Sequence, residues 1–345
     1  MEPLITISIA AYNAEKYLQK CIDTMISCKM LDKMQIIVVN DGSKDLTQEI
    51  AKKNSIMFPD SIECVNKANG GHGSTINTSI SLAKGKYFKI VDSDDWVETQ
   101  NMDKLIEYLE NATSDMVINP YYRVNAKTGN KTLISPFSKE PPKASIMSTI
   151  EELLTCEYKM AMHSVTFRTD LLKKVGPIID NHCFYVDAEY TLFPIKYART
   201  FTYLKFSIYD YLIGTQDQSV NMKNMIKRRQ QHLTVCKRII DYYHNNKDIL
   251  TDSQEKIIVK RIEEFICYQY IILLNNNNKN EVAEFDRYLY DADLTLYKSS
   301  VSYGKKQLKS KYIYLLDRMR SKEFKNYFLL SKIIEAHRML TSIKR

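Results

Sequence analysis

The sequence predicts an α/β protein, with a doubly wound, mostly parallel sheet in residues 1–220 and a mainly helical domain in residues 221–345. Through the first part, short apolar runs alternate with stretches of helical spacing, which is the pattern of strands joined by right-handed helical crossovers. The second part differs, because all eight prolines and eight of the nine glycines precede residue 221. A segment with one glycine and no proline is typical of nearly continuous helix.

The elements of the first domain follow from the spacing of apolar residues. Apolar, β-branched runs mark buried strands, and apolar residues at intervals of three and four mark helices. Ser43 or Asp45 is expected to cap the second helix. In chain order the predicted elements are strands at 4–11, 35–39, 62–66 and 87–91, helices between them at 14–27, 46–53 and 74–83, and then a strand at 161–167, an edge strand at 209–212 and a loop at 214–219.

Polar residues follow three of these strands at their carboxyl ends. Tyr12 and Asn13 follow the first strand, Asn40 and Asp41 follow the second, and residues 92–95 (DSDD) follow the fourth. In a parallel sheet these ends share one edge, and ligands bind beyond that edge. The sequence therefore predicts a ligand site where the three clusters meet.

Two common nucleotide-binding motifs are missing from this edge. Residues 10–13 (AAYN) replace the G-x-G-x-x-G of a dinucleotide site, and residues 70–75 (GGHGST) lack the lysine of a P-loop. A negatively charged ligand would then need a cation beside Asp92, Asp94 and Asp95. Clustered carboxylates repel one another unless a positive charge joins them, and Mg²⁺ and Mn²⁺ prefer such oxygen ligands. For Asp95 a second interpretation stays open, as the N-cap of the next helix with Glu98 as its capping-box partner.

Five segments, taken together, resemble a known family. Each is weak alone, but their order and spacing over residues 3–220 are similar to the family 2 glycosyltransferases of the GT-A fold, of the bacterial polysaccharide-biosynthesis type. The segments are 11–14 (AYNA), 39–43 (VNDGS), 69–77 (NGGHGSTIN), 83–87 (AKGKY) and 91–96 (VDSDDW).

The resemblance implies an inverting transferase that uses Mn²⁺ or Mg²⁺ and moves a sugar from a nucleotide donor, with a UDP-sugar expected. The acceptor would be a hydroxyl of a glycan or lipid-linked oligosaccharide in surface polysaccharide synthesis. Asp41 would accept a hydrogen bond from the uracil N3–H, unless it only forms an Asp-Gly turn. Asp94 would bind the metal, and Asp92 would contact the ribose or a metal-bound water. The donor-binding set is Ala10, Ala11, Tyr12, Asp41, Asn69, Gly70, Ser74, Asp92, Ser93 and Asp94, with Asp94 and Asp92 at the metal.

The catalytic base is expected in residues 184–190 (FYVDAEY). An acceptor hydroxyl is a poor nucleophile until a carboxylate removes its proton. The family usually has adjacent Glu and Asp here, whereas this chain has Val186 and Asp187, with Glu189 two residues later. By alignment Asp187 is the base and Glu189 the second candidate. The alternative is ordinary placement of acids at a helix N-terminus.

Several residues are weaker candidates. Asp95 and Trp96 would lie on the acceptor side, and Gln218 and Ser219 would belong to the loop that closes over the donor. Closure of such a loop excludes water from the reaction. Two histidines, at 163 and 182, are extra metal or acceptor contacts or else structural residues.

The second domain is strongly basic. Residues 221–345 hold 25 Lys and Arg against 14 Asp and Glu, and residues 301–345 hold 12 against 3. A basic amphipathic helix can lie on an anionic membrane surface, but its apolar stripe can equally pack on the first domain, and both interpretations stay open. We expect no nucleic-acid partner, because no recognition motif is present. The stripe consists of Leu308, Tyr312, Leu315, Leu316 and Met319.

Other features favour a cytoplasmic protein, peripheral at the inner face of the cell membrane if the basic helix binds lipid. The seven cysteines form no C-x-x-C pair, and no charged and apolar leader follows Met1. Two rival functions remain. A sugar-nucleotide pyrophosphorylase would have a glycine-rich basic signature after the first strand, which this chain lacks. A non-catalytic glycan- or membrane-binding protein is disfavoured by the joint presence of Asp41, Asp92, Asp94 and Asp187.

Overall fold

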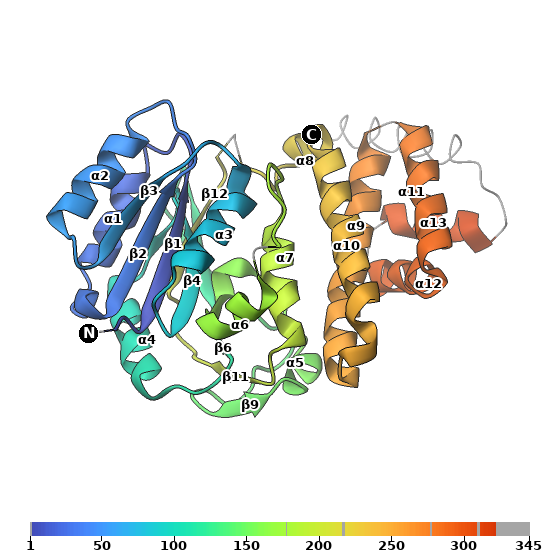
Figure 1. The fold of residues 1–345 in the computed structure, drawn as a ribbon. Helices are drawn as coiled ribbons and strands as arrows, with labels where there is room; N and C mark the ends of the chain where they lie inside the picture. Colours follow the sequence, from blue (N-terminus) through green and yellow to red (C-terminus); the bar gives the residue numbers. More distant parts are fainter. Residues whose placement is uncertain (1, 177, 216–217, 277, 309–310, 322–345) are drawn as a thin grey trace. The chain divides into compact units, whose positions relative to one another are not determined.

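The computed structural model describes residues 2–176, 178–215, 218–276, 278–308 and 311–321. The chain divides into two compact units, Met1–Gln218 and Ser219–Arg345, two residues from the boundary predicted at 220. The first unit is an α/β structure and the second consists of helices (Figure 1). The predicted α/β class with C-terminal helices is confirmed.

The large sheet of the first unit has the strand order β3-β2-β1-β4-β10-β6-β11-β9. Its first four strands are parallel, as predicted, and begin and end within one or two residues of the predicted limits. Beyond β4 the sheet is mixed, because β10 pairs antiparallel with both β4 and β6. The strands are β1 (Ile5–Ala11), β2 (Met34–Asn40), β3 (Ile62–Asn66), β4 (Tyr87–Asp92), β6 (Met116–Ile118), β9 (Met147–Thr149), β10 (Val165–Arg168) and β11 (Thr200–Tyr203).

A second, four-stranded sheet has the order β5-β12-β7-β8. The prediction of an edge strand at 209–212 is wrong, because β12 pairs with β5 on one side and with β7 on the other. This central position carries Tyr209 and the backbone of Leu212 to the end of β4, where both contact Asp95. The strands are β5 (Trp96–Val97), β7 (Tyr121–Asn125), β8 (Lys131–Ile134) and β12 (Tyr209–Ile213).

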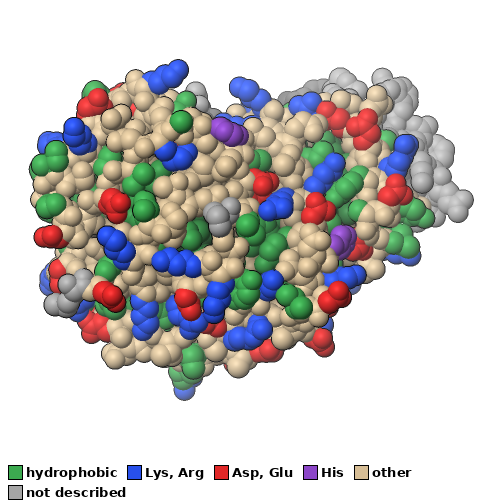
Figure 2. All heavy atoms as spheres, viewed as in Figure 1, with side chains coloured by type: hydrophobic (Ala, Val, Ile, Leu, Met, Phe, Trp, Pro, Cys, Tyr) green, Lys and Arg blue, Asp and Glu red, His purple; other side chains and the backbone are tan. Residues whose placement is uncertain are grey.

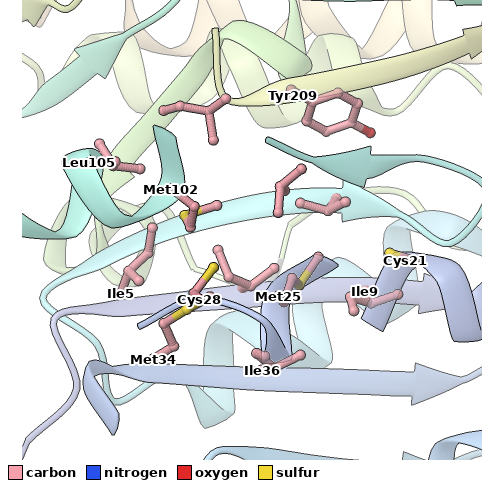
Figure 3. Packing of buried hydrophobic residues seen from close by; sticks show 14 of the residues in the cluster. Ile5, Ile9, Cys21, Met25, Cys28, Met34, Ile36, Met102, Leu105 and Tyr209 are labelled. Carbon is pink, nitrogen blue, oxygen red and sulfur yellow. The ribbon is translucent and has the colours of Figure 1, made fainter. Parts of the chain in front are cut away.

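Helices lie on both faces of the large sheet (Figure 1). On one face, alternate β1 side chains pack with residues of α1 and α4 in a single apolar cluster, which includes Ile5, Ile9, Met25 and Leu105 (Figure 3). Each such side chain stabilises the fold by about 1.5–3 kcal/mol on full burial. The helices of this unit are α1 (Leu18–Ile26), α2 (Thr47–Met57), α3 (Gly71–Leu82), α4 (Thr99–Asn111), α5 (Glu152–Thr155), α6 (Thr169–Val175) and α7 (Asp187–Leu192).

Two predicted helix caps differ from the structure. Helix α4 begins at Thr99 with Glu98 in the N-cap position, so the capping interpretation of Asp95 is wrong. Helix α2 has Leu46 in its N-cap position. Asp45 precedes this N-cap residue, but its carboxylate still accepts the backbone N–H of Thr47, the first residue of α2, at 3.1 Å.

The second unit contains six described α-helices, and between two of them α10 ends at Asn275 and Asn278 caps α11. Basic and acidic side chains are interspersed on the face seen in Figure 2. No helix among the described residues is both long and apolar enough to cross a bilayer. The helices are α8 (Met222–Lys227), α9 (Arg229–Asn246), α10 (Asp252–Asn275), α11 (Lys279–Ala292), α12 (Leu294–Tyr303) and α13 (Lys311–Ser321).

The predicted basic, apolar-striped helix corresponds to α13. Leu316 is fully buried, and α13 packs against α10 and α12 within its own unit. Arg320 forms an ion pair with Asp286 at 2.5 Å and lies over the ring of Tyr297. The described part of the stripe is therefore internal to the second unit. The side chains of Tyr312 and Met319, and all of residues 322–345, lie outside the described part of the chain.

Candidate active site

The carboxyl ends of β1, β2 and β4 lie side by side. Ala11 is in register with Asn40 of β2, and Ala10 is in register with Asp92 of β4. The strand register thus brings together the polar clusters that the sequence places at three separate points. At the end of β1, Ala11 is buried and Ala10 is partly exposed, and Tyr12, which follows the strand, is 52% exposed.

Asp92 contacts a histidine that the sequence analysis gave no separate role. One carboxylate oxygen lies 3.3 Å from Nε2 of His72, near the start of α3. Burial would lower the pKa of His72, but the hydrogen bond to Asp92 and the charges of Asp92, Asp187 and Asp94 outweigh it and raise that pKa. His72 therefore lies within electrostatic reach of acids from two distant parts of the chain.

The next two acids have contrasting surroundings. Asp94 is exposed to solvent, but desolvation by the surrounding protein and the charge of Asp92 raise its pKa to about 6. Asp95 is buried and accepts hydrogen bonds from the Tyr209 hydroxyl at 2.6 Å and the Leu212 backbone N–H at 2.7 Å. The Tyr209 hydroxyl also accepts the backbone N–H of Asp92 at 3.1 Å. Asp95 thus holds the end of β4 against β12, while Asp94 faces outward.

Three residues are close enough to share a metal ion. One ligand atom each from Asp92, Asp95 and His163 lies within 4.8 Å of the other two. The imidazole of His163 stacks on Tyr121 and Tyr211, with ring centroids 5.1 and 4.2 Å away. Burial lowers the pKa of His163 to about 4, so the ring is neutral at pH 7, as a metal ligand must be.

His182, the other histidine considered from the sequence, has a different position. Its side chain is exposed and lies outside the described cluster that could share a metal ion. Its backbone N–H donates to the carbonyl of Gly70 at 2.6 Å.

Asp41 is engaged by its own neighbours. It is 2% exposed, and its carboxylate accepts the Lys67 ammonium and the Gly70 N–H at 2.9 Å each and the Gly71 N–H at 2.8 Å. In this state the residue predicted to accept from uracil holds the loop before α3 instead. Asn69 joins the same loop by donating to the Asp41 carbonyl at 2.9 Å, and Ser74 accepts from Lys67 at 2.8 Å.

The two candidate bases differ in exposure. Asp187 is partly exposed at the first position of α7. Glu189 is fully buried and accepts the backbone N–H of Asp180 at 2.8 Å. These surroundings favour a solvent-side role for Asp187 and a structural one for Glu189.

The weaker candidates lie around the second sheet. Trp96 lies under the Lys20 ammonium, which is 3.0 Å from the ring centroid. Gln218 donates to the Tyr211 hydroxyl and the Leu212 carbonyl at 3.0 and 3.1 Å. Ser219 begins the second unit, and residues 216–217 of the predicted closing loop lie outside the described part. Sequence reasoning missed His72 although it stands inside the NGGHGSTIN segment, and it missed Tyr209 because its strand was assigned to an edge.

Comparisons with known proteins agree with this fold. Residues 6–176 match the family model "Glycosyl transferase family 2". The glycosyltransferase GlyA of Streptococcus pneumoniae is 35% identical over 125 residues, covering 36% of this chain and 18% of GlyA. The putative glycosyltransferase EpsH of Bacillus subtilis is 23% identical over 80% of this chain and 78% of EpsH.

Among solved structures, the fold is similar to that of S. aureus TarS 1–349 in complex with UDP-GlcNAc. The TM-score is 0.65 at 18% identity, covering 98% of this chain and 92% of that structure. The likeness extends over both units of this chain, and it identifies the first as a GT-A fold.

Proposed function

The chain carries a glycosyl transferase family 2 domain, and we propose that it transfers a sugar, with inversion, from a UDP-sugar to a hydroxyl of a glycan or lipid-linked acceptor in surface polysaccharide synthesis. The observation that carries the proposal is the convergence of acids from separate elements. Asp92 ends β4 and lies 3.3 Å from Nε2 of His72, Asp94 follows it by two residues, Asp187 begins α7, and the charges of all three raise the pKa of His72. Donor chemistry and acceptor chemistry need such acids side by side. The complex of TarS with UDP-GlcNAc supports a UDP-sugar as the donor.

The residues at the end of β4 fit a divalent cation. Asp94 combines an outward-facing carboxylate with a pKa raised by desolvation and by its neighbour Asp92, which is the condition that a cation relieves. Asp94 and Asp92 would hold Mn²⁺ or Mg²⁺, since carboxylate oxygens suit these ions, and a ring nitrogen of neutral His163 lies within 4.8 Å of a carboxylate oxygen of Asp92. A bound cation supplies stabilisation of the negative charge on the departing diphosphate. Asp95 keeps the strand end in place through Tyr209 and Leu212.

The remaining steps belong to side chains of the chain itself. Asp187 would take the proton from the acceptor hydroxyl on the face of the sugar opposite the leaving group, which inverts the anomeric carbon. Buried Glu189 would support this end of α7 through Asp180. Exposed Tyr12 and partly exposed Ala10 offer the nucleobase a surface at the end of β1.

We place the reaction in the cytoplasm, at the inner face of the membrane. The support is the basic surplus of residues 301–345 and the lipid-linked acceptor proposed above. Within the described residues Arg320 is engaged by Asp286, so residues 322–345 are the better candidates for contact with lipid.

The proposal is tested by nucleotide release. The full chain is incubated with a panel of nucleotide sugars and Mn²⁺, and release of the nucleoside diphosphate is followed. We expect release from a UDP-sugar, a loss of about 10²-fold or more in Asp187→Asn, and near-normal release in Glu189→Gln, whose amide oxygen still accepts from Asp180. Tight UDP binding without release from any sugar nucleotide would support the non-catalytic rival. Full activity of Asp187→Asn would remove Asp187 as the base.

A further inference from the structure

We propose that the glycine-rich segment 69–77 (NGGHGSTIN) is a docking bed for the backbone of residues 179–183, and that Gly73 and Asn77 are positioning residues that fix Asp187. This inference rests on the proposed function and extends it, because it gives the motif a task on the acceptor side of the site.

The first observation is steric. A Cβ at Gly73 would overlap the carbonyl oxygen of Asp180, and it would also lie 2.9 Å from the side chain of Ile179. A Cβ at Gly71 would lie 2.9 Å from both the backbone N and the Cα of His182, and Gly71 has a φ of +79°. Backbone atoms cannot yield as the tip of a side chain can, so glycine at both positions allows the second segment to lie directly on the first.

The second observation is a set of hydrogen bonds that hold the two segments together. The Asn77 side-chain amide donates to the Ile179 carbonyl at 2.8 Å and accepts the Ile179 N–H at 3.4 Å. The His182 N–H donates to the Gly70 carbonyl at 2.6 Å. Asn77 therefore pairs with both polar backbone groups of one residue, and contacts at Gly70 and Asn77 secure both ends of the bed.

The docked segment leads directly to Asp187. The Asp180 N–H donates to buried Glu189, two residues beyond Asp187 in α7. His182 and Tyr185 have left-handed φ values of 52° and 70°, so the chain turns sharply twice between the bed and the helix. A chain held at Ile179, Asp180 and His182 leaves the start of α7 little freedom to move.

The same glycines are tied to the donor side. Asp41 accepts the N–H groups of Gly70 and Gly71, and His72 contacts Asp92. One segment of chain thus contacts the end of β2, the end of β4 and the approach to α7. The glycines and Asn77 of this segment thereby align the proposed base, Asp187, with the donor.

The test uses Gly73→Ala and Asn77→Ala in the full chain, with Ser81→Ala on the exposed face of α3 as the matched control. Docking is measured by mass spectrometry as the rate at which N-ethylmaleimide modifies Cys183, which is 6% exposed in the docked segment. We expect this rate to rise in both variants and to stay at the wild-type value in Ser81→Ala. Since alanine is the better helix former by about 1 kcal/mol, a stable fold of Gly73→Ala is compatible with lost docking.

Positioning is measured as the split between kcat and KM for the UDP-sugar. Misplacement of a catalytic group lowers kcat, so we expect kcat to fall about tenfold or more in both variants while the donor KM stays within about twofold. Unchanged protection of Cys183 would overturn the docking, and faster modification with unchanged kcat would overturn the positioning. Should Gly73→Ala not fold, Asn77→Ala decides both points. Failure of the proposed function shows separately, as wild-type protein that releases no nucleotide while Cys183 still responds.

Discussion

Lys89 should make the stability of this protein depend on pH in a defined way. It lies in the middle of β4, fully buried, and its nitrogen donates to the carbonyl oxygens of His163 at 3.0 Å and Val165 at 3.3 Å. Burial lowers the pKa of Lys89 from 10.5 to about 7. Protonating it inside the folded chain is correspondingly unfavourable, by roughly 5 kcal/mol relative to the unfolded chain.

The sign of the effect follows from which state binds the proton. Below pH 7 both states carry it, and folding bears the full cost of a buried charge. Between pH 7 and 10.5 the folded chain has lost the proton and the unfolded chain retains it, so stability rises with pH. Between pH 7 and pH 10, the free energy of unfolding of the wild type should therefore rise by roughly 3 kcal/mol more than that of Lys89→Met.

Urea unfolding followed by circular dichroism at several pH values measures this difference. Lys89→Met also loses the hydrogen bonds to the carbonyl groups of His163 and Val165, which lowers its stability by the same amount at every pH. The test is therefore how the difference in stability between wild type and variant changes with pH. The exposed Lys84, replaced by Met, is the matched control and should run parallel to the wild type. A difference between wild type and Lys89→Met that varies by less than about 1 kcal/mol over this range would refute the reasoning.

Two other predictions concern the donor loop and the C-terminal charge. Asp41→Ala removes the common acceptor of Lys67, Gly70 and Gly71, so we expect the free energy of unfolding to fall by roughly 2–4 kcal/mol. Urea unfolding measures this loss. A loss as small as that of the exposed-site variant Asp60→Ala would contradict the role of Asp41 in holding the loop. Removal of residues 322–345 leaves the described helices intact and deletes six of the basic residues; we expect weaker co-sedimentation with anionic liposomes than with the full chain, and equal sedimentation would contradict membrane contact through this segment.

The parallel half of the sheet could be predicted from the sequence because each strand is a short, mostly apolar run followed by polar residues. The strands β6 and β9 have only three residues each, too few to show a period. Their partners are also distant in sequence, as in the pairing of β6 with β11. The strand predicted at 161–167 is β10, which is confined to Val165–Arg168. Residues 209–212 were expected to form an edge strand, and only the tertiary pairing of β12 with β5 and β7 reveals its central place.

At the site, the sequence could predict the acids but not their separate roles. Asp92, Asp94 and Asp95 stand at one strand end, and chain position alone gives them equal weight. Contacts with Tyr209 and Leu212, more than a hundred residues away, hold Asp95 and leave Asp94 outward-facing. Likewise the resemblance assigned Asn69, Gly70 and Ser74 to the donor, whereas the close contact of Gly71 and Gly73 with residues 179–183 depends on a distant part of the chain.

In the proposed mechanism a divalent cation joins Asp92 and Asp94, at the carboxyl end of β4, to a nucleoside diphosphate. Calorimetric titration of UDP with and without Mn²⁺ tests this directly in wild type, Asp94→Ala and the surface control Asp60→Ala. We predict that Mn²⁺ raises the affinity for UDP about tenfold or more in wild type and Asp60→Ala, and that Asp94→Ala shows no such gain. An equal gain in Asp94→Ala would contradict the account.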